Sequence, residues 1–162
     1  IKEYFMSNIN KTSQNVRAFA VVKGSNKYPD ITGVVQFSES LRGIIVTARI
    51  YGLPYTDVPC SYGIYGFHIH NGEKCSGNDS DPFADTDGHY NPHDCPHPYH
   101  AGDMPPLFGN KGYAYMSFLT DRFTLNEVIG KTVVIHQSPA DFKTPPSGNS
   151  GEKIACGVIS LV

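Results

Sequence analysis

Two neighbouring runs of residues decide the fold: Ile31-Thr-Gly-Val-Val-Gln-Phe37 and Gly43-Ile-Ile-Val-Thr-Ala-Arg-Ile-Tyr51. Both are rich in β-branched and aromatic residues, which is typical of β-strands. Turn-forming residues surround them, since Tyr28-Pro29-Asp30 precedes the first run and Gly52-Leu53-Pro54 follows the second. Together with an earlier β-type run at residues 17–22, the first run predicts a hairpin near the N-terminus.

Short β-type runs continue along the rest of the chain. We expect further strands at residues 62–70, 112–119, 131–136 and 154–162, and one helical turn at residues 124–129. Glycine, proline and polar residues dominate two long loops, at residues 71–111 and 137–151. Seven or eight short strands without helical crossovers predict an all-β fold, either a Greek-key sandwich or a flattened barrel.

Length and composition favour a single water-soluble domain. The chain has 162 residues, with 13 basic and 15 acidic side chains and a formal charge of −2. We place the domain at residues 17–162, after an N-terminal extension at residues 1–16. The near-neutral charge without a basic block argues against nucleic-acid binding, and no apolar run reaches the roughly 18–20 residues of a membrane helix. The first residues lack a secretory signal pattern, but the chain does not begin with Met, so this absence is uninformative.

The four cysteines permit disulfide bonds but do not determine their pairing. They stand at positions 60, 75, 95 and 156. Two disulfides would favour an oxidising compartment, yet four thiols also allow three pairings or none. The spacing of the cysteines alone therefore does not determine which of them are bonded.

Histidine is concentrated in the middle of the chain: all seven lie between positions 68 and 136. His68 and His70 are two residues apart in an expected strand, so both side chains point to the same face with Cβ atoms about 7 Å apart, which lets two imidazoles share one metal. His136 ends another expected strand and could join them from a neighbouring position. An imidazole-rich site of this kind favours copper.

The loop segment from His89 to Asp103 carries a second set of candidate ligands. It holds His89, His93, His97, His100 and Asp103 within fifteen residues. Three ring nitrogens and one carboxylate oxygen in a tetrahedral arrangement suit zinc, and the bound ion would order a loop that otherwise lacks a reason to be so long. The alternative is a mobile histidine-rich loop that binds metals loosely.

Several ordered motifs resemble the copper/zinc superoxide dismutase family. They are Gly66-Phe-His-Ile-His70, Gly88-His-Tyr-Asn-Pro92, His100-Ala-Gly-Asp103, Val133-Val-Ile-His136, and Gly148-Asn-Ser-Gly followed by Ala155-Cys-Gly-Val-Ile159. The match runs in order over roughly residues 17–162. It implies an eight-stranded Greek-key barrel with residues 71–111 as the metal-binding loop and residues 137–153 as the loop of the active-site channel.

The resemblance also implies two metal ions and a reaction. It makes copper ligands of His68, His70, His89 and His136. It makes zinc ligands of His89, His97, His100 and Asp103. Copper would be reduced by one superoxide and reoxidised by another, giving molecular oxygen and hydrogen peroxide, with His89 bridging the metals and carrying a proton. The interval from His97 to His100 is shorter than in animal members and resembles bacterial ones.

Two positions depart from the family pattern. Lys153 stands where the family has an arginine, so it is the candidate for attracting the superoxide anion; it keeps the charge but loses the two-pronged donor geometry. Neighbouring Glu152 would oppose the anion if it faced the channel, although a solvated position fits it better. Ala140 stands where many members have an aspartate that links copper and zinc ligands, which leaves Asp141 as the remaining carboxylate for that role and puts the zinc site in doubt.

The resemblance pairs Cys75 with Cys156 and leaves two cysteines over. Cys60 and Cys95 could form a second bridge or remain free thiols, and Cys95 could instead bind zinc. His93 is a spare histidine, and a register in which it replaces His97 stays open. The disulfides favour an extracellular or periplasmic location, while family members also keep their bridge in the cytosol. Many relatives dimerise, so a homodimer is a further expectation.

Three functions compete on this evidence. The first is an active enzyme that removes superoxide, favoured because all four copper positions are histidine. The second is a non-catalytic relative that stores, carries or is structured by metal. A zinc hydrolase fits poorly, because no carboxylate general base accompanies His68 and His70 in the sequence.

Overall fold

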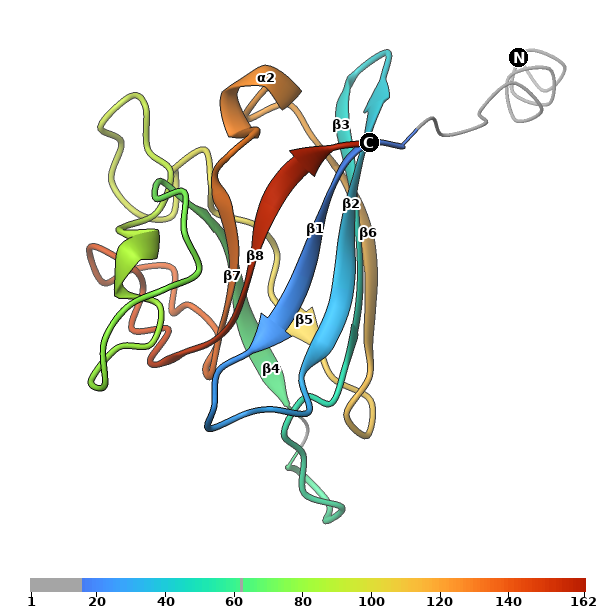
Figure 1. The fold of residues 1–162 in the computed structure, drawn as a ribbon, viewed down its shortest axis with the longest axis vertical. Coiled ribbons are helices and arrows are strands. Elements are labelled where there is room, and N and C mark those ends of the chain that lie inside the picture. The colour runs from blue at the N-terminus through green and yellow to red at the C-terminus, as the bar shows by residue number, and fades with distance from the viewer. Residues whose placement is uncertain (1–15, 62) are drawn as a thin grey trace, which may run out of the picture.

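The computed structural model describes residues 16–61 and 63–162 and shows an all-β molecule (Figure 1). The strands are β1 (Val16–Gly24), β2 (Thr32–Ser40), β3 (Gly43–Tyr51), β4 (Ile64–His70), β5 (Leu107–Phe108), β6 (Ala114–Thr120), β7 (Thr132–His136) and β8 (Lys153–Leu161). Two short helices accompany them, a 3-10 turn at Ala84–Thr86 and α2 at Leu125–Val128. The N-terminal residues 1–15 and Tyr62, the first residue expected of the fourth strand, lie outside the described residues.

The eight strands form one antiparallel sheet that curls into a nearly closed barrel. Its order is β5-β4-β7-β8-β1-β2-β3-β6, so β8 returns to lie between β7 and β1. The strands β5 and β6 stand at the two ends of this order and lie close to one another, which leaves only a narrow seam. The predicted eight-stranded barrel is confirmed.

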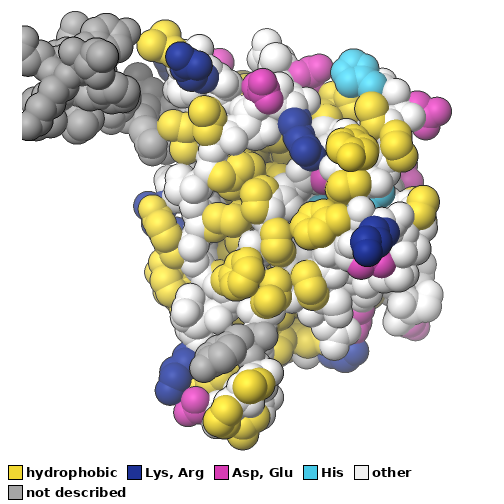
Figure 2. Space-filling view, turned by 180° about the vertical axis from the view of Figure 1, so that it is seen from behind, with side chains coloured by type: hydrophobic (Ala, Val, Ile, Leu, Met, Phe, Trp, Pro, Cys, Tyr) yellow, Lys and Arg dark blue, Asp and Glu magenta, His cyan; other side chains and the backbone are white. Residues whose placement is uncertain are grey.

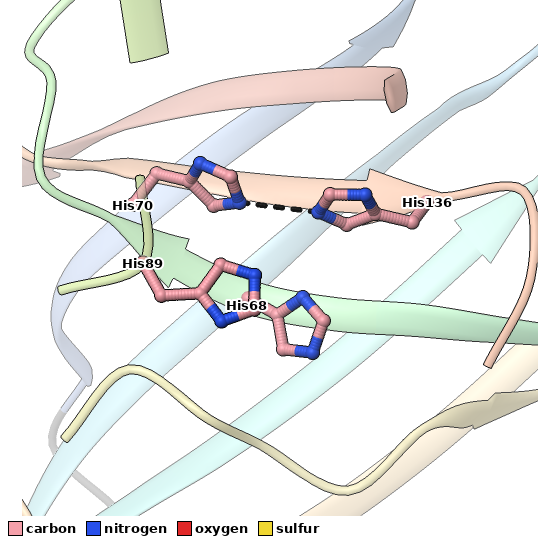
Figure 3. A group of neighbouring side chains, drawn as sticks. All are labelled: His68, His70, His89 and His136. Atoms are coloured by element: carbon pink, nitrogen blue, oxygen red, sulfur yellow. Dashed lines mark hydrogen bonds between the residues drawn. The ribbon is translucent and has the colours of Figure 1, made fainter. Parts of the chain in front are cut away.

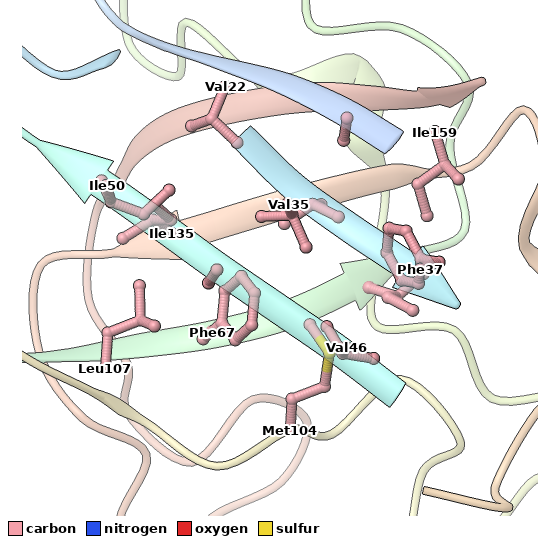
Figure 4. Close-up of a cluster of buried hydrophobic side chains, with 14 of the residues drawn as sticks. Val22, Val35, Phe37, Val46, Ile50, Phe67, Met104, Leu107, Ile135 and Ile159 are labelled. Carbon is pink, nitrogen blue, oxygen red and sulfur yellow. The ribbon is translucent and has the colours of Figure 1, made fainter. Parts of the chain in front are cut away.

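Alternating side chains fill the barrel. Along β2 and β3 every second residue is buried, as expected for strands with one face on a core. Val35 and Phe37 of β2, Val46 and Ile50 of β3 and Phe67 of β4 meet inside it (Figure 4). This apolar interior fixes the register of each strand, because a shift by one residue would turn its apolar side chains outward.

Most expected elements appear at or near their predicted positions. The run at residues 43–51 is β3 as predicted, and the other expected strands differ at their ends by one to three residues. The expected helical turn is α2, where Thr124 and Glu127 form a capping box. The two-residue strand β5 was missed, because it lies within the segment 71–111 that we expected to be a loop. Within the described residues, no helix has the length and apolar character needed to cross a bilayer.

The loop between β4 and β5 lies against the second half of β4. The amide of Ile69 donates to the carbonyl of Gly102, and the amide of Tyr90 donates to the carbonyl of Ile69. Gly102 is required here, since a Cβ would collide with the Ile69 carbonyl oxygen. Isolated β-bridges follow on either side, joining His68 with Asp103 and His70 with His89. These backbone contacts therefore place His89 and Asp103 of the loop directly beside His70 and His68 of β4.

One disulfide attaches this loop to the barrel. Cys75 bonds to Cys156 of β8, as the family resemblance predicts. The suggested second bridge is wrong: Cys60 and Cys95 are free thiols. Cys60 belongs to the β3–β4 connection and Cys95 to the β4–β5 loop, and these two segments leave the barrel at opposite ends (Figure 1). Their separation prevents a bond.

Candidate metal centre

Four histidine rings from three elements converge on one side of the barrel wall (Figure 3). They are His68 and His70 of β4, His136 of β7 and His89 of the β4–β5 loop, and each offers a ring nitrogen within 4.8 Å of the others. We call this the four-histidine group. The shortest separation of ring centroids is 4.0 Å, between His68 and His89. The strands β4 and β7 are direct neighbours, which brings His136 beside the β4 pair.

Strand geometry explains this arrangement. His68 and His70 point to the outer face of the sheet, beneath the loop, while Ile69 between them packs in the core. At the end of β7 the pairing with β8 shifts register between Ile135 and His136. Such a bulge redirects the side chain next to it, and it stands where His136 meets the others.

Backbone carbonyls orient two of the rings. Nδ1 of His70 lies 2.7 Å from the carbonyl of Asp87, and Nδ1 of His136 lies 3.3 Å from that of Gly151. A carbonyl only accepts, so Nδ1 carries the proton in both rings and Nε2 keeps a lone pair. These two Nε2 atoms face each other at 3.1 Å (Figure 3). Two lone pairs at this distance repel unless a cation satisfies both.

Burial keeps the imidazoles uncharged. It lowers the pKa of His68 and His70 well below the ordinary value of 6.5, and neighbouring histidines lower it further. Burial also lowers the pKa of His136 to about 4. The rings of His68, His70 and His136 are therefore neutral at neutral pH, which is the form that binds a metal ion.

A second group lies next to the first and consists of three histidines around one carboxylate. Its members are His89, His97, His100 and Asp103, and we call it the histidine–aspartate group. Oxygens of Asp103 lie 2.7 Å, 3.1 Å and 3.3 Å from the Nδ1 atoms of His89, His97 and His100 respectively. Burial acts to raise the pKa of Asp103, but the hydrogen bond from His89 and the surrounding histidine charges outweigh it, so the pKa is lowered.

The donor sets fit copper and zinc. Buried ring nitrogens without a hydrogen-bond partner are Nδ1 of His68, Nε2 of His89 and both nitrogens of His97. Buried polar atoms of this kind are costly unless a ligand satisfies them. Four imidazoles suit copper, and three imidazoles with one carboxylate suit a tetrahedral zinc ion. His89 belongs to both groups, with Nδ1 beside Asp103 and Nε2 unpartnered.

The structure also places the alternative zinc candidates. His93 and Cys95 belong to neither group. His93 is exposed, and the backbone of Cys95 is held by the side chain of Asn91 instead. The register in which His93 replaces His97 and the idea of Cys95 as a ligand are therefore not supported by the geometry.

Lys153 is tied to the β4–β5 loop. Its Nζ donates to the carboxylate of Asp81 at 2.8 Å and to the carbonyl of Phe83 at 3.0 Å, and its side chain is 16 % exposed. Asp81 was missed by sequence reasoning, because 72 residues separate it from Lys153 and no motif links them. Glu152 is held by Lys27 at 2.6 Å and by the hydroxyl of Tyr28. Its carboxylate is thus neutralised at the tip of the β1–β2 hairpin.

Asp141 does not take the linking role that we expected for it. Its carboxylate accepts hydrogen bonds from the amides of Lys143 and Thr144, from the Thr144 hydroxyl and from Asn149. These bonds lower the pKa of Asp141 to about 2. The hydrogen-bond partners of the carboxylate all belong to its own loop, and no histidine among the described residues donates to it.

The space beside His97 is occupied by small residues. A Cβ added to Gly148 would lie 2.5 Å from Nε2 of His97 and 2.9 Å from the Cβ of Ala140. Ala140 itself is buried. Gly148 therefore lies next to Nε2 of His97, Ala140 lies nearby, and this nitrogen has no hydrogen-bond partner.

Comparison with known proteins agrees with this geometry. The family model described as copper/zinc superoxide dismutase matches residues 31–159. The chain is 33 % identical over 150 residues to the protein named superoxide dismutase [Cu-Zn] of Deinococcus radiodurans, covering 82 % of this chain and 79 % of that one. It is 38 % identical over 149 residues to superoxide dismutase [Cu-Zn] 1 of Aquifex aeolicus, covering 83 % of each. It is 31 % identical over 162 residues to superoxide dismutase [Cu-Zn] A of Xenopus laevis, covering 90 % of this chain and 98 % of that one.

The shared motifs and the two donor groups lie within the matched segment, since His68 is the first ligand candidate and His136 the last. The match covers more than half of the chain, and the relatives are aligned over most of their own length. This chain therefore belongs to the copper/zinc superoxide dismutase family.

Proposed function

We propose that this chain converts two superoxide anions and two protons into one molecule of oxygen and one of hydrogen peroxide. The observation that carries the proposal is the pair of buried donor groups that share His89. One superoxide gives up an electron and leaves as oxygen, and the second gains that electron together with both protons. Electrons and atoms balance without any other reactant.

Each of the two groups is assigned one metal ion. His68, His70, His89 and His136 would hold copper, which would supply the one-electron redox chemistry, and His89, His97, His100 and Asp103 would hold zinc, which would supply a fixed positive charge. The carbonyls of Asp87 and Gly151 orient His70 and His136. Asp103 lies beside Nδ1 of His89, which is the ring nitrogen that would bind zinc.

His89 is the residue that we assign to proton delivery. Its Nε2 is buried and unpartnered, while Asp103 fixes the opposite edge of the ring. Nε2 would bind either copper or a proton, and a proton held there in place of copper is directed into the four-histidine group, where the second superoxide needs it. The side chain of His89 is only 2 % exposed, so bulk water does not compete for this position.

Lys153 is the residue that we assign to attracting the anion. Its positive charge lies near enough to contribute to the lowered pKa values of His70 and His136. Asp81 holds the ammonium in place and offsets part of its charge. The ammonium attracts the anion as a point charge, because lysine has no planar fork to hold two oxygens.

Metal analysis with an activity assay tests the proposal. We expect one copper and one zinc per chain and rapid removal of superoxide. His136→Ala should lose copper and activity together, whereas His93→Ala, which alters an exposed histidine outside both groups, should lose neither. Zinc alone, with no turnover after copper loading, would select a non-catalytic metal-binding protein instead.

Location and assembly are further proposals. The Cys75–Cys156 disulfide supports an oxidising compartment, extracellular or periplasmic. A homodimer is supported by apolar side chains that gather on the face seen in Figure 2, and the exposed residues of β5 and β6 include Phe108, Tyr115 and Leu119. Sedimentation velocity checks the assembly, since a dimer should have twice the mass of the 17.8 kDa chain.

A further inference from the structure

Arg122 reaches from the barrel into the loop that carries the histidine–aspartate group. It follows β6 and precedes α2. Its Nη1 donates to three backbone carbonyls, those of Pro98 at 3.2 Å, His100 at 3.4 Å and Asp103 at 3.1 Å. One nitrogen of a single side chain thus gathers three carbonyls from a segment of six residues.

These carbonyls lie within residues 97–103, which supply three of the four donors. His97 precedes Pro98, while His100 and Asp103 are themselves members of the group. Three carbonyl oxygens that converge on one point repel each other, and a cation at that point offsets the repulsion. The positive charge of Arg122 therefore stabilises a backbone arrangement in which the three carbonyls would otherwise move apart.

The segment is held from two sides. On one side the carbonyl of Gly102 accepts a hydrogen bond from Ile69 of β4, and on the other Arg122 binds the carbonyls. Within it, the amide of His100 donates to the Asp103 carboxylate at 3.1 Å. One outside contact comes from strand β4 and the other from the connection that follows β6.

We propose that Arg122 is a positioning residue that holds the histidine–aspartate group in its zinc-binding arrangement before the ion arrives. The proposal rests on the assignment of this group to zinc. The hydrogen bonds of the Arg122 side chain within the described residues all go to backbone carbonyls, so it acts through the backbone of the donor segment. Its contribution is preorganisation, because a segment already ordered loses less conformational freedom on binding.

Zinc affinity measured by competition with a chromogenic chelator tests the proposal without an activity assay. Arg122→Ala should weaken zinc binding by about 10–100-fold, the usual effect of removing an outer support of a metal site. Arg122→Lys should weaken it less, since one ammonium keeps the charge but not the reach of the guanidinium. Arg42→Ala is the matched control, because the Arg42 side chain is exposed and has no hydrogen-bond partner among the described residues.

The visible absorption of Co²⁺ bound in place of zinc is the second measurement. A displaced donor set should change its d–d bands in Arg122→Ala, which a general loss of stability would not do. Unchanged zinc affinity and an unchanged Co²⁺ spectrum in Arg122→Ala would overturn the proposal, and so would an equal loss of affinity in Arg42→Ala. If Arg122→Ala does not fold, Arg122→Lys decides in the same way.

Failure of this inference is distinguishable from failure of the zinc assignment. His97→Ala removes a proposed ligand and should weaken zinc binding regardless of the role of Arg122. If His97→Ala binds zinc as tightly as the unaltered chain, the assignment of the group is wrong. If His97→Ala binds weakly and Arg122→Ala binds normally, only the positioning role is wrong.

Discussion

At the scale of single residues, Lys153 and Asp81 form an ion pair beside the four-histidine group. Lys153→Gln removes the positive charge of the pair and leaves the negative charge of Asp81 without a partner. We expect kcat/KM for superoxide to fall about tenfold at low ionic strength, because attraction of an anion by a nearby cation raises its rate of encounter. The measurement is the rate constant as a function of salt, and the difference from the unaltered enzyme should shrink as ions screen the charge.

A lysine in a distant ion pair provides the control for this prediction. Lys111 pairs with Asp57, and both side chains are exposed. Lys111→Gln should leave the rate constant nearly unchanged at every salt concentration. A loss in Lys153→Gln that is the same at low and high salt would speak against electrostatic attraction.

His97 offers a second prediction at this scale. Its Nε2 lies close to Gly148, in the neighbourhood of Ala140, and lacks a hydrogen-bond partner. Ala140→Asp would supply one, fix the orientation of the ring and strengthen zinc binding by about tenfold. Chelator competition measures the change, with Ala140→Asn as a comparison of the same size and no charge. Weaker zinc binding in Ala140→Asp would show that the space beside His97 cannot take a carboxylate.

Residues that share a strand or a short loop were predictable, and residues that meet only in the folded chain were not. The spacing of His68 and His70, and the density of histidines near Asp103, both point to metal binding before any fold is known. Asp81 and Arg122 act through contacts with distant segments, and a lone aspartate or arginine carries no signal of its partner. Asp141 was misjudged because its neighbours Lys143 and Thr144 compete for the carboxylate.

At the scale of elements, the segment between β7 and β8 depends on the hydrogen bonds of Asp141. The pKa of Asp141 in the folded chain is about 2, below the ordinary value of 3.8. The folded state therefore binds the proton of this carboxyl group less tightly than the unfolded state. The stabilisation is complete above about pH 4 and is lost as the pH falls through about 2.

Asp141→Ala should therefore lower the melting temperature at pH 5 and have a smaller effect near pH 2. Thermal unfolding followed by circular dichroism at both values measures the difference. Asp121→Ala serves as the control, because no hydrogen bond to its carboxylate occurs among the described residues. An effect of Asp141→Ala that does not change with pH would contradict the ionic contribution.

Strands were predictable from composition where they are long. Every strand of five or more residues was expected from its β-branched and aromatic residues, and β3 was predicted to the residue. The two-residue strand β5 is too short for any pattern and exists only because β4 offers it a partner at Ile64 and Tyr65. The path of the β4–β5 loop could not be foreseen either, since it follows from single hydrogen bonds to β4.

At the scale of the whole molecule, the Cys75–Cys156 disulfide closes a chain segment of 81 residues. Removing it by Cys75→Ser together with Cys156→Ser should lower the free energy of unfolding by about 4.5 kcal/mol, as chain entropy predicts for a closed loop of this size. Urea denaturation of the metal-free protein measures the change. Cys60→Ser, at an exposed free thiol, should change it by less than about 0.5 kcal/mol.

The hydrogen bonds between the β4–β5 loop and β4 have a consequence for the solubility of the molecule. Beyond its short pairing with β5, this side of β4 finds its partners in the loop, through Gly102 and Tyr90. If the loop detached, this side of β4 would become an exposed sheet edge with unpaired backbone groups, which could pair with the same edge of another molecule. Without metals the loop is held only by these hydrogen bonds, by Arg122 and by the disulfide, so metal-free molecules should detach it more often and aggregate faster than metal-loaded ones.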